Sequence, residues 1–234
     1  PSSQRVIVAE FDPAGGDIAT RFGRAFEPGV ISLAAAVRRS SGSAAAIDHC
    51  QQVLGGVDVL MAPAAPAQLT AAVRLLDERR EWAELRGGEP QILADCGRLV
   101  DEPTVAHLLQ ASSLVVVLAR PILSELHHVS SRLSTLQALG GRVALVLSGH
   151  GPYSAGEVAD TLNVDVLGSL PGDPESAAIL AGAPGSRRAL ARLPLLRSAA
   201  ELVEKLQMTV LPEAKPTTSK TVTELDASLA GCAT

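Results

Sequence analysis

The sequence predicts an α/β fold, a doubly wound and mainly parallel sheet with helices on both faces. Short runs of apolar and β-branched residues alternate with longer segments of helical periodicity, an order typical of this class. The strand candidates are almost continuously apolar, as strands covered on both faces are. They lie at residues 5–10, 57–61, 91–95, 114–119, 142–147 and 164–167.

Helices are expected between these strands, at residues 67–84, 121–139, 154–162, from 174 onward and 198–208. Ser154 and Glu157 form the S-x-x-E pattern of a capping box at the start of the third helix. Asp173 followed by Pro174 supplies an N-cap and a proline at the first helical position of the fourth.

The composition limits the class of protein. The chain has 234 residues, 47% of them apolar and 19% charged, which is enough for a buried core. The net charge of -5 argues against a basic nucleic-acid-binding domain. Only three of the 20 basic residues are lysines, Lys205, Lys215 and Lys220, so lysine chemistry is excluded from residues 1–204. There is no signal peptide, membrane-spanning run or C-x-x-C pair, and we expect a cytoplasmic protein.

Two segments are expected from the distribution of residue types. Residues 1–211 carry the strand and helix patterns of one domain. Pro, Thr, Ser and Lys dominate from Pro212 to Thr221, so residues 212–234 are predicted to form a flexible tail. Val222, Leu225 and Leu229 recur at helical spacing within it. The tail is therefore either frayed or a docking peptide for a partner.

Acidic residues follow the first and third predicted strands. Asp12 and Asp95 stand at strand ends, where open parallel sheets bind ligands. Carboxylates there suit a magnesium ion, bound directly or through water, with a nucleotide phosphate completing its shell. The glycine turn between Asp12 and Asp17 lacks G-x-x-x-x-G-K-[ST], and its carboxylates would repel a phosphate. We therefore expect no phosphate cradle in this turn.

Several motifs, in order, resemble MinD/ParA-type P-loop ATPases. Residues 6–17, VIVAEFDPAGGD, are similar to the second-strand motif of that family and most similar to its actinobacterial MinD-like group. Residues 92–98, ILADCGR, resemble the Walker B strand with its glycine switch. Residues 143–150 and 167–173 resemble the late strands whose loops hold adenine and ribose. The resemblance spans residues 5–206.

The resemblance implies roles for individual residues. Asp12 matches the switch acid that orients the attacking water, and Asp95 matches the acid that holds magnesium through water. Gly97 matches the hinge whose main-chain N–H senses the γ-phosphate. Pro171 and Asp173 match the base-binding loop. Ser148 stands where the family has Asn, a departure that affects adenine recognition.

The family's lysine-bearing Walker A loop and its preceding strand have no counterpart here, because only Pro1–Gln4 precede the matching segment. That strand is central in the family's sheet, and a gap there would leave the main-chain groups of the two neighbouring strands without hydrogen bonds. We therefore expect the two neighbouring strands to pair directly, or a partner chain to supply a strand between them.

The resemblance then implies a hydrolysis-deficient regulatory or scaffolding domain acting through protein–protein contacts in division, partition, or pilus and secretion assembly. The alternative is an ATPase whose Walker A segment is missing from these residues. The implied cofactors are ATP or ADP with magnesium, or none, and the implied partners are another protein or a second copy of the chain. An unrelated Rossmann-like domain ranks last, because no G-x-G-x-x-G is present.

Overall fold

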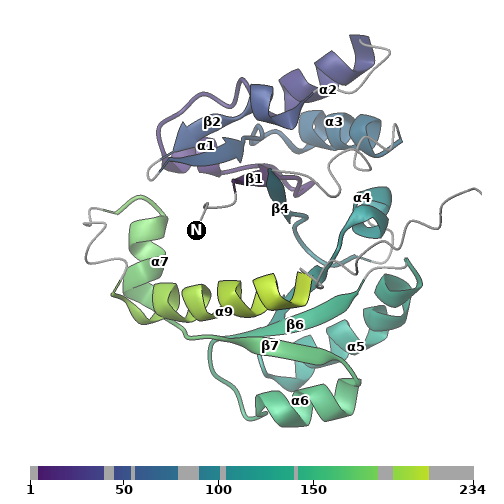
Figure 1. Ribbon diagram of the computed structural model, residues 1–234, viewed down its shortest axis with the longest axis vertical. Helices are drawn as coiled ribbons and strands as arrows, with labels where there is room; N and C mark the ends of the chain where they lie inside the picture. Colours follow the sequence, from purple (N-terminus) through teal and green to yellow (C-terminus); the bar gives the residue numbers. More distant parts are fainter. Residues whose placement is uncertain are drawn as a thin grey trace, which may run out of the picture.

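A computed structural model describes residues 5–39, 45–53, 56–78, 90–100, 104–139, 142–183 and 192–210 (Figure 1). The tail predicted at residues 212–234 lies outside this part of the chain. The described strands and helices form an α/β fold of parallel sheets flanked by helices, which confirms the predicted class.

The first sheet has the strand order β2-β3-β1-β4. Its members are β2 (Gln51–Val53), β3 (Val57–Leu60), β1 (Val6–Glu10) and β4 (Gln91–Asp95). β1 runs parallel to both β3 and β4, whereas β2 is an antiparallel edge strand. The register of β1 with β4 pairs Glu10 with Asp95. The loops after these two strands therefore begin side by side.

The second sheet has the order β5-β6-β7, with β5 (Val115–Ala119), β6 (Val143–Ser148) and β7 (Asp165–Leu170). All of its pairs are parallel. The six predicted strands are all present; β4 has the predicted ends, and the ends of the other strands differ from the predicted ones by at most three residues. β2 was not predicted, because it is three residues long and two of them are glutamines.

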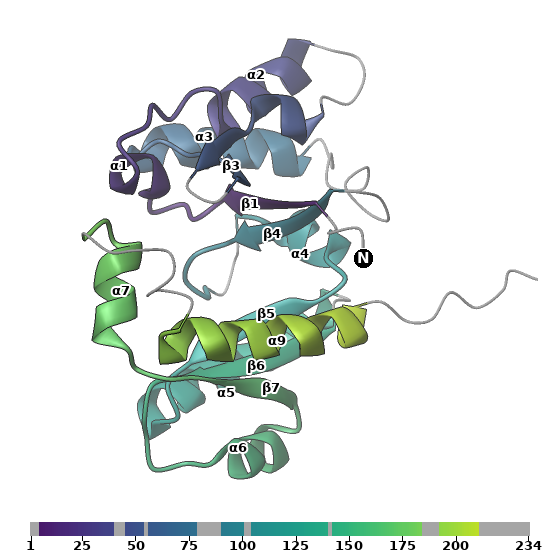
Figure 2. The same ribbon diagram turned by 60° about the vertical axis from the view of Figure 1, so that its left-hand side comes forward.

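The helices cover both faces of the sheets (Figures 1 and 2). They are α1 (Ile18–Arg21), α2 (Val30–Arg39), the 3₁₀ helix η1 (Ala46–His49), α3 (Pro66–Glu78), α4 (Ala106–Ala111), α5 (Leu123–Ala138), α6 (Ala155–Leu162), α7 (Pro174–Leu180) and α9 (Pro194–Val210). Both predicted N-caps are confirmed. Ser154 and Glu157 form a reciprocal capping box, and the Asp173 side chain accepts from Ser176 N.

The main core lies between one face of the sheets and helices α2, α3, α4 and α5. Ile7 and Ala9 of β1 are fully buried in it, and Leu145 of β6 is buried on the same face. On the second face, α1 packs Ala19 against Val59 of β3, and α9 lies along β7. The second face is therefore covered near β3 by α1 and near β7 by α9.

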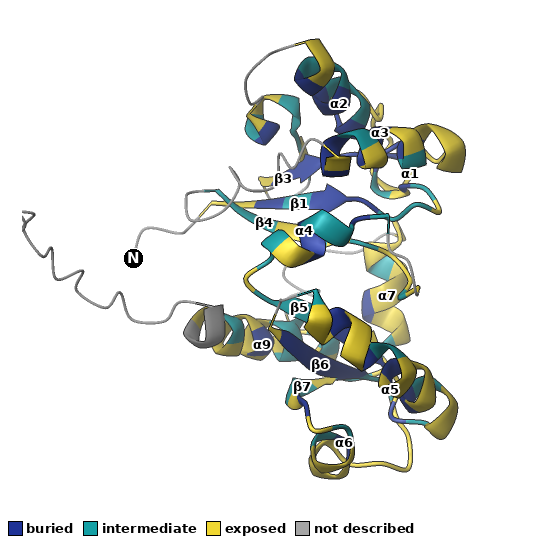
Figure 3. Cartoon of the chain, turned by 90° about the vertical axis from the view of Figure 1, so that its right-hand side faces the viewer, coloured by how far each residue is buried: buried dark blue, intermediate teal, exposed yellow. Residues whose placement is uncertain are grey.

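We expected the two strands that flank the family's missing central strand to pair directly, and for β4 and β5 this expectation is wrong. β4 ends the first sheet and β5 begins the second, and no strand pairing joins them in the described part of the chain. Figure 3 shows β4 and β5 as the nearest strands of the two sheets, with the sheets kept apart. Leu93 on β4 and Leu118 on β5 are each 61% exposed, although both strands have the apolar sequence of buried ones.

The carboxyl ends of the strands in both sheets lie on the same side of the molecule. A Cβ on Gly182, after α7, would lie 3.3 Å from the carbonyl oxygen of Arg21, at the end of α1. A Cβ on Gly151, after β6, would lie 2.1 Å from the oxygen of Pro121, after β5. The end of α7 therefore lies beside the end of α1, and the loops after β5 and β6 are in close contact. No described helix combines the length and hydrophobicity needed to cross a bilayer.

Candidate functional site at the strand ends

The loop after β1 places Asp12 at the strand-end edge. Its side-chain Oδ1 accepts a 2.9 Å hydrogen bond from Ala14 N, and its carbonyl oxygen accepts a 3.0 Å bond from Gly15 N. Both bonds close a tight turn, the local role that Asp commonly takes before glycine. Asp12 is half-buried, so its carboxylate still reaches solvent.

The loop after β4 brings Asp95 and Gly97 to the same place. Asp95 is exposed, and its Oδ1 accepts a 3.0 Å bond from Gly97 N. Phe11 N donates to the carbonyl oxygen of Asp95 at 2.8 Å, which extends the β1–β4 pairing into the loops.

Asp12 and Gly97 are in direct contact. Gly97 has φ +73°, and a Cβ there would lie 2.3 Å from both Cγ and Oδ1 of Asp12. The position requires glycine for its backbone angle and for the space that the carboxylate occupies. The structure therefore brings Asp12, Asp95 and Gly97 together, which are three of the six site residues named from the sequence.

Cys96, between Asp95 and Gly97, is not a nucleophile. Burial and, to a smaller extent, the negative charges of Asp95 and Asp12 together raise the pKa of its thiol to about 12. The thiolate is the reactive form of cysteine, so this thiol is inert at neutral pH. The interpretation of Cys96 as a packing residue is supported by its contact with the main core.

The carboxylate of Glu10, the last residue of β1, accepts hydrogen bonds from the N–H groups at the N-terminal end of α1. The side chain is 5% exposed, and its Oε1 accepts from Asp17 N at 2.8 Å and Ile18 N at 2.9 Å. Oε2 accepts from Ala62 N at 2.9 Å. Gly15 N and Gly16 N donate to other protein oxygens, those of Asp12 and Pro63.

All four N–H groups of residues 15–18 are thus bound within the protein. A phosphate cradle requires free N–H groups at a helix start. The residues of this turn do not fit a phosphate, as expected from the sequence, although the reason is Glu10 rather than Asp12 and Asp17. Sequence reasoning did not assign this role to Glu10, because it depends on Ala62, which is 52 positions away. The Asp17 side chain instead forms an ion pair with Arg21.

Ser148, Pro171 and Asp173 gather at the strand-end edge of the second sheet. β6 ends at Ser148, which is paired with Leu170 of β7, and Gly149 N donates to the Leu170 oxygen at 2.8 Å. Ser148 and Pro171 are therefore close along the edge. The Asp173 carboxylate accepts from Ser176 N, Ser176 Oγ and Leu195 N, at 3.1, 2.6 and 3.2 Å. Those bonds, chiefly from Ser176, lower the pKa of Asp173.

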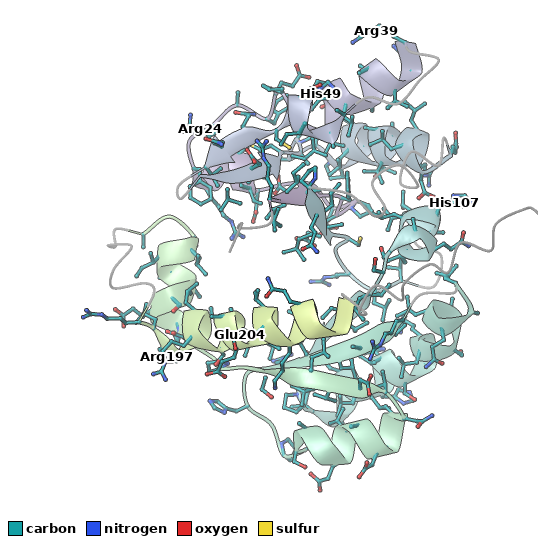
Figure 4. All side chains as sticks on the ribbon, in the orientation of Figure 1. Arg24, Arg39, His49, His107, Arg197 and Glu204 are labelled. Atoms are coloured by element: carbon teal, nitrogen blue, oxygen red, sulfur yellow. The ribbon has the colours of Figure 1, made fainter. Side chains whose placement is uncertain are left out.

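The histidines do not assemble a metal site. His107 Nδ1 lies 2.9 Å from Oδ2 of Asp77, and His49 Nδ1 lies 2.8 Å from Ser32 Oγ. Figure 4 shows His49 and His107 on separate elements. No group of three His, Cys, Asp or Glu side chains suited to a metal occurs among the described residues. Asp12 and Asp95 are hard oxygen donors that suit magnesium, but these two would need water and a bound anion to complete its shell.

Comparisons with known proteins show a fold. No protein-family model and no curated protein matches the chain. A ParA family ATPase from Chlorobium tepidum has a TM-score of 0.68 at 14% identity, over 89% of this chain and 87% of the other. The septum site-determining protein MinD of Pyrococcus horikoshii, complexed with Mg-ADP, has a TM-score of 0.68 at 16% identity, over 87% and 83%.

The cell division ATPase MinD of Pyrococcus furiosus has a TM-score of 0.67 at 17% identity, over 88% of this chain and 86% of the other. The similarity extends over both sheets. The described chain therefore has the fold of the MinD/ParA ATPases.

Proposed function

We propose that this chain is a MinD/ParA-like regulatory or scaffolding domain, deficient in ATP hydrolysis as it stands, that acts through protein–protein contacts. The observation that carries the proposal is the Glu10 carboxylate, which accepts the N–H groups of Asp17 and Ile18 at the start of α1. This turn therefore does not take the place of the family's Walker A loop, which lies ahead of the segment that residues 6–17 resemble.

The electrostatics of the edge support the same proposal. Phosphoryl transfer depends on cationic groups and N–H donors that neutralise the phosphate charge. Here two carboxylates, Asp12 and Asp95, stand at the edge, and residues 1–204 contain no lysine. Neither carboxylate forms an ion pair with a described residue. Without a bound cation, the two carboxylates disfavour the phosphates of ATP at this edge.

Isothermal titration calorimetry with ATP in the presence and absence of magnesium tests the proposal. We expect no magnesium-dependent binding to the 234-residue chain. A micromolar, magnesium-dependent affinity would overturn the proposal, and Asp95→Asn is the variant that should then abolish the magnesium dependence.

A second candidate is an ATPase whose Walker A segment lies outside these residues. The contact of Asp12 with Gly97, beside Asp95, favours it, because carboxylates next to a positive-φ glycine at adjacent strand ends suit a magnesium nucleotide. In this function Asp95 and Asp12 would hold magnesium through water, Asp12 would orient the attacking water, and Gly97 would be the switch hinge. Ser148, Pro171 and Asp173 would line the base site.

The two candidates differ in one observable feature. A reading frame that encodes G-K-[ST] upstream of Pro1 would favour the ATPase, and its absence would favour the regulatory domain. Under both we propose a cytoplasmic protein that self-associates or binds a protein partner, with roles in division, partition, or pilus and secretion assembly. Gel filtration that shows a strict monomer at all concentrations would contradict self-association.

A further inference from the structure

A buried carboxylate on α3 takes no part in the candidate site at the strand ends. Asp77, the last residue but one of α3, is 7% exposed. Burial of an ionised carboxylate is unfavourable unless hydrogen bonds compensate its charge. The groups that donate to Asp77 therefore show what this carboxylate holds in place.

The described hydrogen bonds to Asp77 come from the start of α4. Its Oδ1 accepts from Leu108 N at 3.0 Å, and its Oδ2 accepts from His107 N at 3.3 Å. The same Oδ2 lies 2.9 Å from Nδ1 of the His107 ring, which Figure 4 labels on α4. His107 and Leu108 are the second and third residues of α4, where main-chain N–H groups have no partner within a helix. Asp77 therefore caps the N-terminus of α4 from another helix.

The two ends of α4 are capped in different ways. At its N-terminus the N-cap is Val105, which makes no side-chain hydrogen bond, so the cap is supplied by Asp77 on α3. At its C-terminus Ser112 N donates to the Leu109 oxygen at 3.2 Å, and Ser112 Oγ donates to the Leu108 oxygen at 2.8 Å. The C-terminal cap would therefore move with α4, whereas the N-terminal cap would stay on α3.

The apolar attachment of α4 is small. The helix has six residues, and helices of this length are not stable without contacts to the rest of the protein. Its buried apolar side chains are Leu108 and Leu109, with Val105 just before the helix. Segments with few buried apolar side chains open locally while the rest of a protein stays folded. The latch is defined here as residues 105–111 together with the Asp77 carboxylate that holds them.

The latch adjoins the loop after β4 that carries the strand-end residues. Cys96, between Asp95 and Gly97, packs against the same main core as the apolar side chains of the latch. Burial raises the pKa of its thiol most, followed by the charges of Asp95, Asp12 and Asp77, so the Asp77 carboxylate also lies near the sulfur. Cys96 is therefore close both to the strand-end carboxylates and to the latch, and its accessibility can report whether the latch is closed.

We propose that the latch is a conformational device, which detaches from α3 as one unit while both sheets stay folded. When it is open, Cys96 is uncovered, and the loop that carries Asp95 and Gly97 loses the anchor at its far end. Asp77 sets how often the latch opens, because the hydrogen bonds from α4 to α3 in the described part of the chain all end on this carboxylate. The latch does not depend on ATP, so the calorimetry above leaves it untouched, and its failure is separate from that of the proposed function.

Residue-resolved hydrogen exchange of the whole wild-type chain is the first measurement. Relative to their intrinsic rates, we expect the amides of Leu108 and Leu109 to exchange at least about tenfold faster than those of Ile7 and Leu145 in the buried strands β1 and β6. Added urea should accelerate exchange less at the latch than at the two strands, because a local opening exposes less surface than global unfolding. Equal protection and equal urea dependence at all four amides would overturn the proposal.

Asp77→Asn tests the carboxylate that holds the latch. The amide keeps one accepting oxygen but loses the charge, so exchange at Leu108 and Leu109 should rise by about tenfold or more. Glu78→Gln is the matched control, because it removes the same charge from the exposed neighbouring position of α3. The control should change exchange at these amides by less than about twofold. Equal effects of the two variants would show that Asp77 does not hold the latch.

His107→Phe is the deciding variant if circular dichroism shows that Asp77→Asn does not fold. It removes the ring N–H that faces Asp77 and keeps both main-chain bonds to the carboxylate. Phenylalanine and histidine have similar helix propensities, so the change leaves the intrinsic stability of α4 nearly the same. We expect exchange at Leu108 and Leu109 to rise by about threefold, as the loss of one hydrogen bond predicts. No rise at these two amides would overturn the proposal.

Alkylation of Cys96 tests the link between the latch and the strand-end loop. In Asp77→Asn, iodoacetamide at pH 8 should modify Cys96 about tenfold or more faster than in the wild type, as measured by mass spectrometry. Asp95→Asn is the charge control, because the charge of Asp95 raises the pKa of Cys96 more than that of Asp77 does. An equal or greater acceleration by Asp95→Asn would assign the effect to charge alone and overturn the latch. Alkylation of the wild type whose urea dependence follows the two buried strands rather than α4 would overturn it as well.

Discussion

Replacing Gly97 by alanine tests the contact on which the candidate site is built. The added Cβ would lie 2.3 Å from Cγ and Oδ1 of Asp12, and the residue would keep φ +73°. Nonbonded carbon contacts lie at about 3.5–4 Å, so the carboxylate must move by about 1 Å or more. That movement breaks the 2.9 Å bond from Ala14 N to Asp12 Oδ1.

The magnitude follows from two contributions. A left-handed backbone angle costs an alanine about 1–2 kcal/mol. Loss of the Ala14–Asp12 hydrogen bond adds about 1–2 kcal/mol, because its acceptor is charged but partly solvated. We expect Gly97→Ala to lower the free energy of unfolding by about 2–4 kcal/mol.

Gly56 is the matched control, because its φ is +75° and nothing lies within 4 Å of its added Cβ. Urea unfolding followed by circular dichroism should give Gly56→Ala a loss of only about 1–2 kcal/mol. In an Asp12→Ala background the cost of Gly97→Ala should fall to that of Gly56→Ala, since the clashing carboxylate is gone. Equal losses for the two single variants would refute the contact between Asp12 and Gly97.

Three further predictions follow from single side chains. Glu10→Gln replaces a carboxylate that accepts three N–H bonds by an amide with only one accepting oxygen. We expect this variant to lower the free energy of unfolding by about 2–4 kcal/mol in urea titrations. A loss below about 1 kcal/mol would contradict the role of Glu10. Cys96 has a thiol pKa raised to about 12, so mass spectrometry should show its alkylation by iodoacetamide at pH 8 to be more than about a hundredfold slower than in the urea-unfolded chain. The hydrogen bonds from Ser176 lower the pKa of Asp173, so its ionised carboxylate stabilises the fold above the unfolded pKa of about 4, and this stabilisation is lost as the pH falls through the folded pKa. The difference in unfolding free energy between the wild type and Asp173→Asn should therefore close between pH 5 and about pH 2. A difference that stays constant with pH would be inconsistent with this linkage.

The sequence predicts the buried strands and misses elements that have weaker local patterns. α2 could have been found, because Val30, Leu33, Ala34 and Val37 repeat at helical spacing and all are buried. β2 could not, because Gln51 and Gln52 resemble a loop and form a strand only by antiparallel pairing with β3. Predicted helix ends also differ from those observed, and α9 begins at Pro194 rather than at residue 198.

The candidate site divides in a similar way. Strand ends are local features, so Asp12 and Asp95 were predicted to stand at them. Their proximity depends on β1 and β4 being neighbours, which strand patterns alone do not specify. The role of Glu10 was out of reach for the same reason, because its buried carboxylate also binds Ala62 N, across the neighbouring strand pair.

The separation of the two sheets shows what an apolar strand pattern measures. The sequences of β4 and β5, QILAD and VVVLA, predict strands that are covered on both faces and paired on both edges. Leu93 and Leu118 are nevertheless 61% exposed, and no described strand pairs with the open edges of β4 and β5. The apolar pattern indicates that a strand is stable when both faces are covered and both edges are paired, and the described chain does not cover or pair all of them. Where pattern and burial disagree on two strands that face each other, the difference indicates a missing neighbour of the same kind, a strand.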